Sequence, residues 1–478
     1  MTDQTESGGD AKRRDQERSA GASGYDARRM KTRAFVLVPW LKSAELEAKR
    51  RGKPFRSQAA RLEEALGLAA AIDLDLVGNA VAVVSEPRPA TLIGEGKVDE
   101  LKGLLEELEV ELVIVDGHLS PVQQRNLEKA WKVKILDRTG LILEIFGERA
   151  HTREGALQVE LAHLNYQKSR LVRSWTHLER QRGGFGFLGG PGETQIEADR
   201  RVIQERITKI ERQLETVKRT RELHRKTRRE VPYPVVALVG YTNAGKSTLF
   251  NRLTEAGVFA ENLLFATLDP TMRAVSLPSG RKIILSDTVG FISDLPTHLV
   301  AAFRATLEEV LEAEVVLHVR DASHEESDIQ KHDVEEVLKS LGLTGEKAEE
   351  PQRPIVEILN KIDRLVPEAR EAMLNAASRD PLTVAVSALT GEGTDELLAL
   401  IDRLVIDKGV SVRVTLMPDE GEAMAWLHEN GQVRARMSNE DGSTVLDVVL
   451  AEAELGRLEK RFPALKERLD AELAHAAE

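Results

Sequence analysis

The chain has 478 residues, of which 41% are hydrophobic and 31% charged, with 34 glycines, 17 prolines and no cysteine. This composition excludes a collagen-like or wholly disordered chain, a disulfide scaffold, thiolate zinc sites and cysteine nucleophiles. At roughly 100–200 residues per domain, the length predicts three or four units. No apolar run approaches the ~18 residues of a membrane helix, and the N-terminus lacks the apolar core of a secretory signal, so we expect a cytoplasmic protein. The formal net charge of −12 argues mildly against a nucleic-acid partner.

The first 150 residues divide into a tail and an α/β domain. Residues 1–30 are polar, charged and rich in glycine and serine, which predicts a disordered tail. Residues 31–150 then alternate strand-like and helix-like runs, which predicts a small α/β domain with a mostly parallel sheet. The expected strands are 34–40, 76–86, 111–117 and 133–138, and the expected helices are 56–72, 97–109 and 120–131. Asp116 ends one of these strands, as a catalytic carboxylate would, but the sequence shows no partner for it.

Residues 151–232 are predicted to form a helical hairpin. Helical spacing continues over 151–180, and 183–192 then holds six glycines and one proline, which predicts a loop at the tip. A long helix is expected over 195–230, because five apolar residues there alternate spacings of four and three, as along a coiled-coil seam. They are Ile203, Ile207, Ile210, Leu214 and Val217.

Two further domains follow the hairpin. A larger α/β domain is expected over 233–409, opening with the apolar strand 235–240. Residues 410–478 are predicted to form a small α+β domain. Its expected strands are 411–417, 433–438 and 443–451, and its expected helices are 420–430 and 454–476.

The strongest motif is GxxxxGKS, formed by Gly240, Gly245, Lys246 and Ser247 between a buried strand and a helix. The glycines let backbone N–H groups turn inward around a phosphate chain, and the helix N-terminus adds its positive dipole end. The lysine bridges the β- and γ-phosphates, and the serine hydroxyl binds Mg²⁺. This P-loop predicts a nucleoside triphosphate site with Mg²⁺ as its cofactor.

The base is specified further along the chain. The residues NKID at 360–363 end an apolar strand, and Asp363 can accept from guanine N1–H and the 2-amino group together, donors that adenine lacks. The residues SAL at 387–389 end another strand, where a backbone N–H can meet guanine O6. With the P-loop at this spacing, these elements predict a GTPase. The predicted fold class is therefore α/β: an N-terminal α/β domain with a helical hairpin, a P-loop GTPase domain (G domain) with a mostly parallel sheet, and a small C-terminal α+β domain.

Between these motifs, Asp287 ends an apolar strand and begins a DxxG motif that closes at Gly290. The aspartate would reach Mg²⁺ through water, and the glycine N–H would bond the γ-phosphate. Upstream, the stretch 263–273 falls where a switch I threonine should bind Mg²⁺. Sequence spacing does not separate Thr267 from Thr271 as that ligand.

Phe291 stands directly after DxxG, where many GTPases carry a glutamine that orients the attacking water. A phenyl ring cannot position water, so a backbone group, a switch residue or a bound partner has to do so. We expect weak intrinsic hydrolysis that a partner accelerates. The alternative is adequate hydrolysis from a rearranged switch.

These motifs resemble those of HflX, a family of bacterial ribosome-associated GTPases in the translation-factor-related class. The resemblance covers roughly residues 31–478. It rests on the P-loop, NKID, LLFATLDPTMR (263–273), DTVGFISDLPTHLVAAFRATLEEV (287–310), IGEGKVDEL (93–101) and GGPGETQIEADRR (189–201). It implies that the threonine of FATLD, Thr267, is the Mg²⁺ ligand of switch I. It also implies binding to the large (50S) ribosomal subunit, with dissociation or rescue of stalled ribosomes under stress.

The candidate site residues follow from the motifs and the resemblance together. The catalytic candidates are Lys246, Thr267 and Gly290, and the Mg²⁺ candidates are Ser247 and Thr267. The GTP-binding candidates are Gly240, Tyr241, Thr242, Asn243, Ala244, Gly245, Lys246, Ser247, Thr248, Phe265, Ala266, Thr267, Leu268, Asp269, Asp287, Thr288, Val289, Gly290, Asn360, Lys361, Ile362, Asp363, Ser387, Ala388 and Leu389.

The charge is unevenly distributed along the chain. Residues 167–230 hold 17 Lys and Arg against nine Asp and Glu, a net of +8, which leaves −20 for the rest. Cations can follow RNA phosphates and aromatic rings can stack on splayed bases, so this segment predicts contact with rRNA, which the resemblance favours. The alternative is a solvated helical surface. The candidate RNA contacts are Arg170, Arg173, Arg180, Arg182, Phe185, Phe187, Arg200 and Arg201.

Two weaker possibilities remain. IGEGK at 93–97 is short and lacks GxxxxGK, so a turn is favoured there over a second nucleotide site. The alternative function is a GTP-regulated RNA-binding scaffold or ribosome-assembly factor with little turnover, but the complete motifs favour hydrolysis of GTP to GDP. Nothing in the sequence demands an oligomer, so we expect a monomer.

Overall fold

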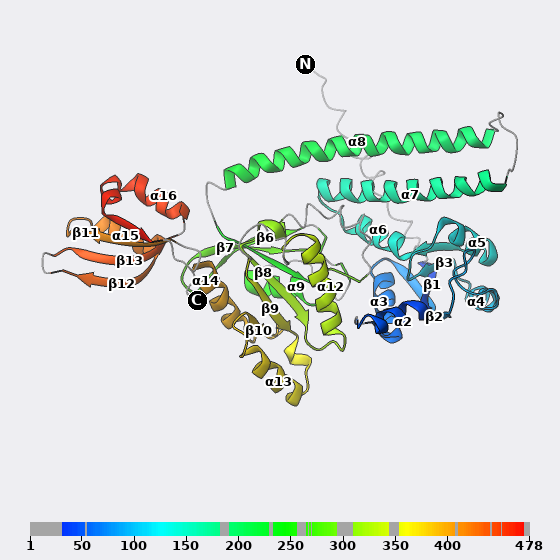
Figure 1. The fold of residues 1–478 in the computed structure, drawn as a ribbon, viewed down its shortest axis with the longest axis horizontal. Helices are drawn as coiled ribbons and strands as arrows, with labels where there is room; N and C mark the ends of the chain where they lie inside the picture. The colour runs from blue at the N-terminus through cyan, green and yellow to red at the C-terminus, as the bar shows by residue number, and fades with distance from the viewer. Residues whose placement is uncertain are drawn as a thin grey trace, which may run out of the picture.

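A computed structural model describes residues 31–52, 55–181, 191–228, 233–255, 264–265, 267–268, 270–293, 309–343, 353–406, 410–439, 442–450 and 452–472. Three sheets follow one another along the molecule (Figure 1). The N-terminal sheet lies at one end, the G-domain sheet in the middle and the C-terminal sheet at the other end. The predicted tail, residues 1–30, lies outside the described residues.

The N-terminal domain is built on a four-stranded parallel sheet in the order β2-β1-β3-β4, which confirms the predicted sheet. Its strands are β1 (Thr32–Leu41), β2 (Leu74–Val84), β3 (Leu112–Val115) and β4 (Lys134–Asp137). Alternate residues of β1 face opposite sides: Ala34 and Val36 belong to one core, whereas Phe35 and Leu37 belong to another. Because both faces are covered, these strands are continuous apolar runs.

Helices cover both faces of this sheet. They are α2 (Lys42–Arg50), α3 (Gln58–Ala70), α4 (Glu95–Glu107), α5 (Pro121–Trp131) and α6 (Arg138–Arg149). Neither α2 nor α6 is apparent in the sequence. Helix α2 buries no residue and therefore has no apolar pattern. Helix α6 follows β4 with no loop between them, and the Asp137 side chain caps it by accepting from the Gly140 N–H at 2.9 Å.

Helices α7 (Arg153–Gln181) and α8 (Pro191–Arg228) lie side by side and form the predicted hairpin (Figure 1). The middle of the predicted seam is buried, since Ile207 and Ile210 are only 3% and 1% exposed, whereas Ile203, Leu214 and Val217 are half-buried. Helix α8 begins at Pro191, four residues earlier than predicted, because proline is favoured in the first turn of a helix. Residues 182–190, at the predicted tip, lie outside the described residues.

The G domain holds a six-stranded sheet in the order β10-β9-β8-β5-β7-β6, parallel except for the edge strand β6, as predicted. Its strands are β5 (Val235–Gly240), β6 (Thr271–Ser276), β7 (Lys282–Asp287), β8 (Val315–Asp321), β9 (Ile355–Asn360) and β10 (Thr383–Ala385). Its helices include α9 (Lys246–Thr254), α12 (Ser327–Ser340), α13 (Pro367–Ala377) and α14 (Thr394–Ile406). Gly240, Asp287 and Asn360 each end a parallel strand, so these motif residues meet at one edge of the sheet.

The C-terminal domain is an antiparallel sheet in the order β12-β13-β11-β14. Its strands are β11 (Val410–Leu416), β12 (Gln432–Ser438), β13 (Thr444–Leu450) and β14 (Leu469–Glu472), and its helices are α15 (Gly421–Asn430), α16 (Glu452–Arg461) and the 3-10 helix η2 (Pro463–Arg468). The predicted helix 454–476 is wrong in its second half. Helix α16 ends before Pro463, whose ring cannot continue it, and β14 pairs with β11. Across the described part of the chain, no helix is long and apolar enough to cross a membrane.

Candidate functional site

Two glycines shape the P-loop between β5 and α9. Gly240 has a φ of +149°, and a Cβ there would lie 2.1 Å from the Val319 carbonyl oxygen. Gly245 has a φ of +93°, and a Cβ there would lie 2.3 Å from the side-chain nitrogen of Asn360. Both the backbone conformation and the packing therefore require glycine at these predicted positions. The loop ends at Lys246, the first residue of α9.

Lys246 is buried behind the loop. Its Nζ donates to the Tyr241 carbonyl oxygen at 2.9 Å. Burial lowers its pKa to about 8, although the nearby Asp287 acts in the opposite direction. An ammonium group has three donors, so phosphate oxygens would supply the acceptors that its desolvated charge requires. The geometry therefore fits the predicted role of Lys246 in binding phosphate.

Three oxygen-bearing side chains meet beside the P-loop. Ser247 Oγ lies 2.8 Å from Thr267 Oγ1, and the two hydroxyls lie 2.6 and 3.0 Å from Asp287 Oδ2. The other carboxylate oxygen, Asp287 Oδ1, is buried and has no hydrogen-bond partner among the described residues. Burial raises the pKa of Asp287, although hydrogen bonds from Ser247 and Thr267 oppose the shift. Hydroxyl ligands around an unsatisfied carboxylate fit a hard cation such as Mg²⁺. Thr271 instead begins β6, so the geometry agrees with the resemblance in favouring Thr267.

Asn360 ties the phosphate end of the pocket to the base end. Its side-chain nitrogen donates to the Ala244 carbonyl oxygen at 2.8 Å, and its side-chain oxygen accepts from the Ala388 N–H at 3.0 Å. Both bonds are buried, so a single amide fixes the separation between the P-loop and the predicted guanine loop.

The rest of the NKID element is cross-linked in the same way. Ser387 Oγ donates to Asp363 Oδ1 at 2.6 Å, which places the predicted guanine-binding carboxylate beside the SAL loop. Lys361 Nζ donates to the Asn243 carbonyl oxygen and to Asp321 Oδ2, each at 2.7 Å. The structure thus brings the P-loop, NKID and SAL together at one edge of the G-domain sheet.

Two residues that support this pocket are absent from the sequence prediction. Arg252 of α9 donates to the Ala388 carbonyl oxygen at 3.2 Å and also to the carbonyl of Leu389. Asp321 ends β8 and pairs with Lys361. Arg252 lies in α9, five residues after Ser247 of the GxxxxGKS motif, and the motif itself assigns it no role. Asp321, in contrast, is the last residue of an apolar strand, which is a signal that the sequence does offer.

The segment after DxxG is attached to the P-loop. The Phe291 N–H donates to the Gly240 carbonyl oxygen at 3.1 Å, and the Phe291 carbonyl oxygen accepts from the Thr242 N–H at 2.8 Å. The Phe291 ring is 2% exposed and belongs to a core cluster that also holds Phe146 and Phe265. The ring therefore packs in the interior, in keeping with the expectation that it takes no part in orienting water.

Several predicted GTP contacts have side chains that face the interior. Phe265, Leu268 and Val289 are buried in the same core cluster, and the Thr288 hydroxyl donates to the Leu238 carbonyl oxygen at 2.6 Å. These residues would therefore contact a nucleotide through their backbone groups. Ala266 and Asp269 lie outside the described residues.

Comparison with known proteins identifies the family. Four family models match in sequence order: "GTP-binding GTPase N-terminal" over residues 59–147, "GTP-binding GTPase Middle Region" over 149–228, "50S ribosome-binding GTPase" over 235–361 and "HflX C-terminal domain" over 372–473. A GTPase HflX from Magnetococcus marinus is 51% identical, over 83% of this chain and 90% of its own length. This chain belongs to the HflX family. It is therefore a GTPase, a hydrolase acting on GTP.

A second relative of this HflX-family chain supports the same assignment. A GTPase HflX from Escherichia coli is 43% identical over 79% of this chain and 87% of its own length. Among solved structures, a GTP-binding protein from Sulfolobus solfataricus in complex with GDP is 24% identical, covers 78% of this chain and 98% of its own, and has a TM-score of 0.41.

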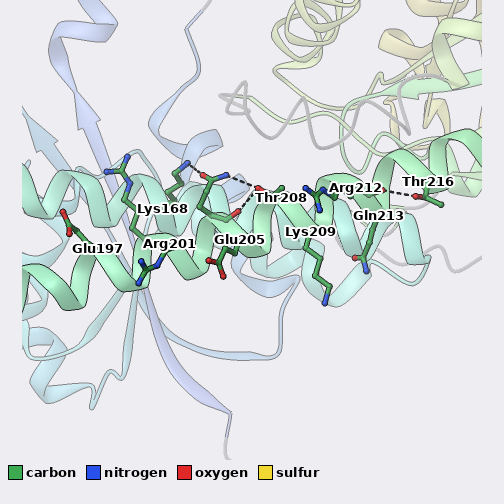
Figure 2. Close-up of a pocket in the computed structure, with 11 residues that line it drawn as sticks. Lys168, Glu197, Arg201, Glu205, Thr208, Lys209, Arg212, Gln213 and Thr216 are labelled. Atoms are coloured by element: carbon green, nitrogen blue, oxygen red, sulfur yellow. Dashed lines mark hydrogen bonds between the residues drawn. The ribbon is translucent and has the colours of Figure 1, made fainter.

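The hairpin of this HflX-family GTPase carries a groove along α8. Figure 2 shows the lining side chains, most of them from α8, with Lys168 contributed by α7. Lys168 Nζ donates to Gln204 Oε1 at 2.5 Å. The predicted RNA contacts Arg200 and Arg201 both line this groove and are exposed. Carboxylates such as Glu205 also line it, so its charge is mixed.

Arg170, a predicted RNA contact, has an internal partner instead. It pairs with the buried carboxylate of Asp137 at 2.6 Å, contacts Gln124 and lies over the Tyr166 ring, 4.3 Å from its centroid. A guanidinium held in this way is not available to RNA phosphates, so the structure does not support that part of the prediction. Arg182, Phe185, Phe187 and the side chains of Arg173 and Arg180 lie outside the described part of the hairpin.

Proposed function

We propose that this HflX-family GTPase binds the large (50S) ribosomal subunit, hydrolyses GTP there, and dissociates or rescues stalled ribosomes under stress. The observation that carries the proposal is the match of residues 235–361 to the family model described as a 50S ribosome-binding GTPase. The assembled nucleotide pocket supports the hydrolytic half of the proposal. We expect the protein to act as a monomer in the cytoplasm.

Each motif has one task in this mechanism. Backbone N–H groups of the P-loop and the Lys246 ammonium bind phosphate oxygens, and the Gly290 N–H bonds the γ-phosphate. Asp363 accepts from guanine and so selects GTP over ATP. Ser247 and Thr267, with Asp287 behind them, are the residues that would hold Mg²⁺. When bound, that ion neutralises charge on the β- and γ-phosphates.

The glutamine that orients the attacking water in many GTPases is replaced in this sequence. Phe291, at the position of the usual glutamine, is buried in the core. A backbone group of a switch segment or a group from the ribosome therefore has to position the water. We infer that hydrolysis is slow in the isolated protein and faster on the 50S subunit.

The rRNA surface that we propose is the groove along α8 together with the glycine-rich tip. The exposed Arg200 and Arg201 would contact phosphates, and Phe185 and Phe187 would stack on bases. Each phosphate contact adds to the salt dependence of binding. Replacing Arg200 and Arg201 by alanine should therefore lower the slope of log affinity against log salt by ~2.

A matched control for this pair is Arg206→Ala. Arg206 is also an exposed arginine of α8, but it pairs with Glu160 of α7 at 2.7 Å and does not line the groove. Its removal should leave the salt slope unchanged. Equal effects of the two variants would count against the groove as the rRNA surface.

The hydrolytic role is tested by single-turnover GTP hydrolysis with and without 50S subunits. We expect a large stimulation by the subunits. No stimulation would favour the alternative, a GTP-regulated RNA-binding scaffold or assembly factor with little turnover. Co-sedimentation with 50S subunits under GTP, GDP and a non-hydrolysable analogue then tests the switch, which equal binding in all three states would contradict.

A further inference from the structure

A network of charged side chains is buried where the N-terminal domain meets the G domain. Arg138 bonds Asp116 and Glu64, each at 2.5 Å. Arg56 bonds Glu64 at 2.6 Å and Glu326 of the G domain at 2.8 Å. These side chains are only 3–10% exposed. Burial would raise the pKa of Glu64, but Arg138 and Arg56 outweigh it and hold this pKa at about 2. Each member therefore depends on its partners for compensation of its charge.

Tyr241 reaches this network from the P-loop. Its hydroxyl donates to Glu64 and accepts from the Ser293 N–H at 2.8 Å and from Arg56 Nη1 at 3.0 Å. Its carbonyl oxygen accepts from Lys246 Nζ at 2.9 Å. One residue therefore contacts the N-terminal domain, the segment after DxxG and the phosphate-binding lysine.

Ser293 is held by the same network. Its Oγ lies 3.0 Å from both Glu64 Oε1 and Arg56 Nη1, and its carbonyl oxygen accepts from Arg138 at 2.9 Å. With the bond from its N–H to Tyr241, each of its polar groups is bonded to this network. A movement of Ser293 would leave buried charges with fewer partners, and such losses are costly.

Gly290, three residues before Ser293, is correspondingly close to the P-loop. A Cβ on Gly290 would lie 2.8 Å from Thr242 Cα and 2.9 Å from Lys246 Nζ. A γ-phosphate has to accept from both the Gly290 N–H and the Lys246 ammonium. The Gly290 backbone and the Lys246 ammonium therefore lie close together beside the P-loop, at the place that a γ-phosphate would have to enter and that GDP would leave empty.

We propose that Tyr241 is a positioning residue that couples the N-terminal domain to the presence of the γ-phosphate. Its hydroxyl stabilises the arrangement in which Ser293 is bonded to the network and Gly290 lies against the P-loop. That arrangement admits GDP and has to open for GTP. The hydroxyl therefore sets the relative affinity for the two nucleotides, because a ligand shifts an equilibrium only by its differential affinity for the two states.

The test is Tyr241→Phe in the full-length protein with Mg²⁺, which removes one oxygen and keeps the ring. The dissociation constants of GDP and of a non-hydrolysable GTP analogue are measured by titration calorimetry. We expect the affinity for the analogue relative to GDP to rise by roughly three- to tenfold, the value of about one hydrogen bond. An unchanged ratio would overturn the proposal, even if the variant were less stable.

Tyr166→Phe is the matched control. The Tyr166 hydroxyl also donates to a buried carboxylate, Asp137, at 2.6 Å, but that carboxylate caps α6 in the N-terminal domain. Its loss should lower stability without changing the nucleotide ratio. A ratio that changed equally in the two variants would show a general loss of stability and would overturn the assignment to Tyr241.

Ser293→Ala keeps the test open if Tyr241→Phe folds poorly. It removes the Oγ contacts to Glu64 and Arg56 and leaves the tyrosine in place. We expect the ratio to change in the same direction by roughly two- to fivefold. In the double variant the two effects should be less than additive, since both residues act through one contact. Full additivity would contradict the coupling.

Discussion

Two parallel sheets of this molecule end in aspartates, yet the two sets of carboxylates differ in their partners. In the G domain, Asp287 is surrounded by hydroxyl groups and keeps one buried oxygen that has no partner in the described part of the chain. In the N-terminal domain, Asp116 is bonded to Arg138, and Asp137 is bonded to Arg170 and Tyr166.

The difference teaches what turns a strand-end aspartate into a ligand site. Next to Asp287 lie the P-loop and small hydroxyl side chains. They leave space for a cation and leave a carboxylate oxygen free to bind it. Next to Asp116 lies Arg138, the residue that follows β4. Its guanidinium forms an internal ion pair with the Asp116 carboxylate. The same sequence pattern therefore gives a predicted Mg²⁺ site in one domain and a structural ion pair in the other.

The largest effect is expected from Arg138→Met, which removes the cation shared by Asp116 and Glu64. Both carboxylates would stay buried with less compensation, so the free energy of unfolding should fall by about 3–5 kcal/mol. Urea unfolding of the nucleotide-free protein measures this loss. A loss below about 1 kcal/mol would mean that the N-terminal carboxylates are not structurally paired and would break the comparison.

Asp287→Asn should act on chemistry rather than on stability. Asp287 Oδ1 has no partner among the described residues, and an asparagine oxygen could still accept from Ser247 and Thr267 as Oδ2 does, so neutralisation should cost little stability. Single-turnover GTP hydrolysis should fall by about 10²–10³-fold. Asp116→Asn is the matched control and should do the reverse, since Arg138 would lose one of its two carboxylate partners. Similar hydrolysis rates in the two variants would contradict the contrast between the two sheets.

Acid should weaken the N-terminal network. The pKa of Glu64 is about 2 in the fold, against an ordinary glutamate value of 4.5, so its contribution to stability is present above pH 4.5 and is lost as the pH falls from 4.5 towards 2. Unfolding free energies measured by urea titration between pH 6 and pH 3 should therefore decrease towards low pH. In Glu64→Gln, the slope of the unfolding free energy against pH should be smaller by the equivalent of up to one proton. An identical slope in the variant would exclude Glu64 as the source of the pH dependence.

The smallest effect is expected from Tyr166→Phe, which removes one donor to Asp137 and leaves Arg170 in place. A hydrogen bond to a charged group contributes about 1.5–3 kcal/mol, so thermal unfolding should occur a few degrees lower. Calorimetry of the full-length protein measures the shift. No shift would indicate that Arg170 and the Gly140 N–H satisfy this carboxylate without the Tyr166 hydroxyl.

The nucleotide pocket could be predicted from the sequence because its chemistry fixes local spacing. Gly240 and Gly245 are required by backbone conformation, and Asp287 and Asp363 must follow strands that end at one sheet edge. The parallel sheets could be predicted for the same reason, since their strands are continuous apolar runs.

The interdomain network could not be predicted. Arg56 and Tyr241 are separated by 185 positions, and Arg56 and Ser293 by 237, so no local pattern connects them. The internal partners of Arg170 could not be predicted either, because a count of charges does not reveal that Asp137 and Tyr166 lie beside it. Strand β14 could not be predicted because the apolar residues of α16 and of the segment after Pro463 together resemble one continuous helix, and its pairing with β11 is not visible in the sequence.

The length of α8 has a mechanical consequence. Its 38 residues span ~57 Å at 1.5 Å per residue, and its C-terminal end precedes β5, the strand that carries the P-loop. A rigid rod of this length acts as a lever: a rotation of ~5° about the end near the G domain displaces the opposite end by ~5 Å. Ångström-scale adjustments at the nucleotide could therefore become movements as large as a nucleobase at the far end of the hairpin.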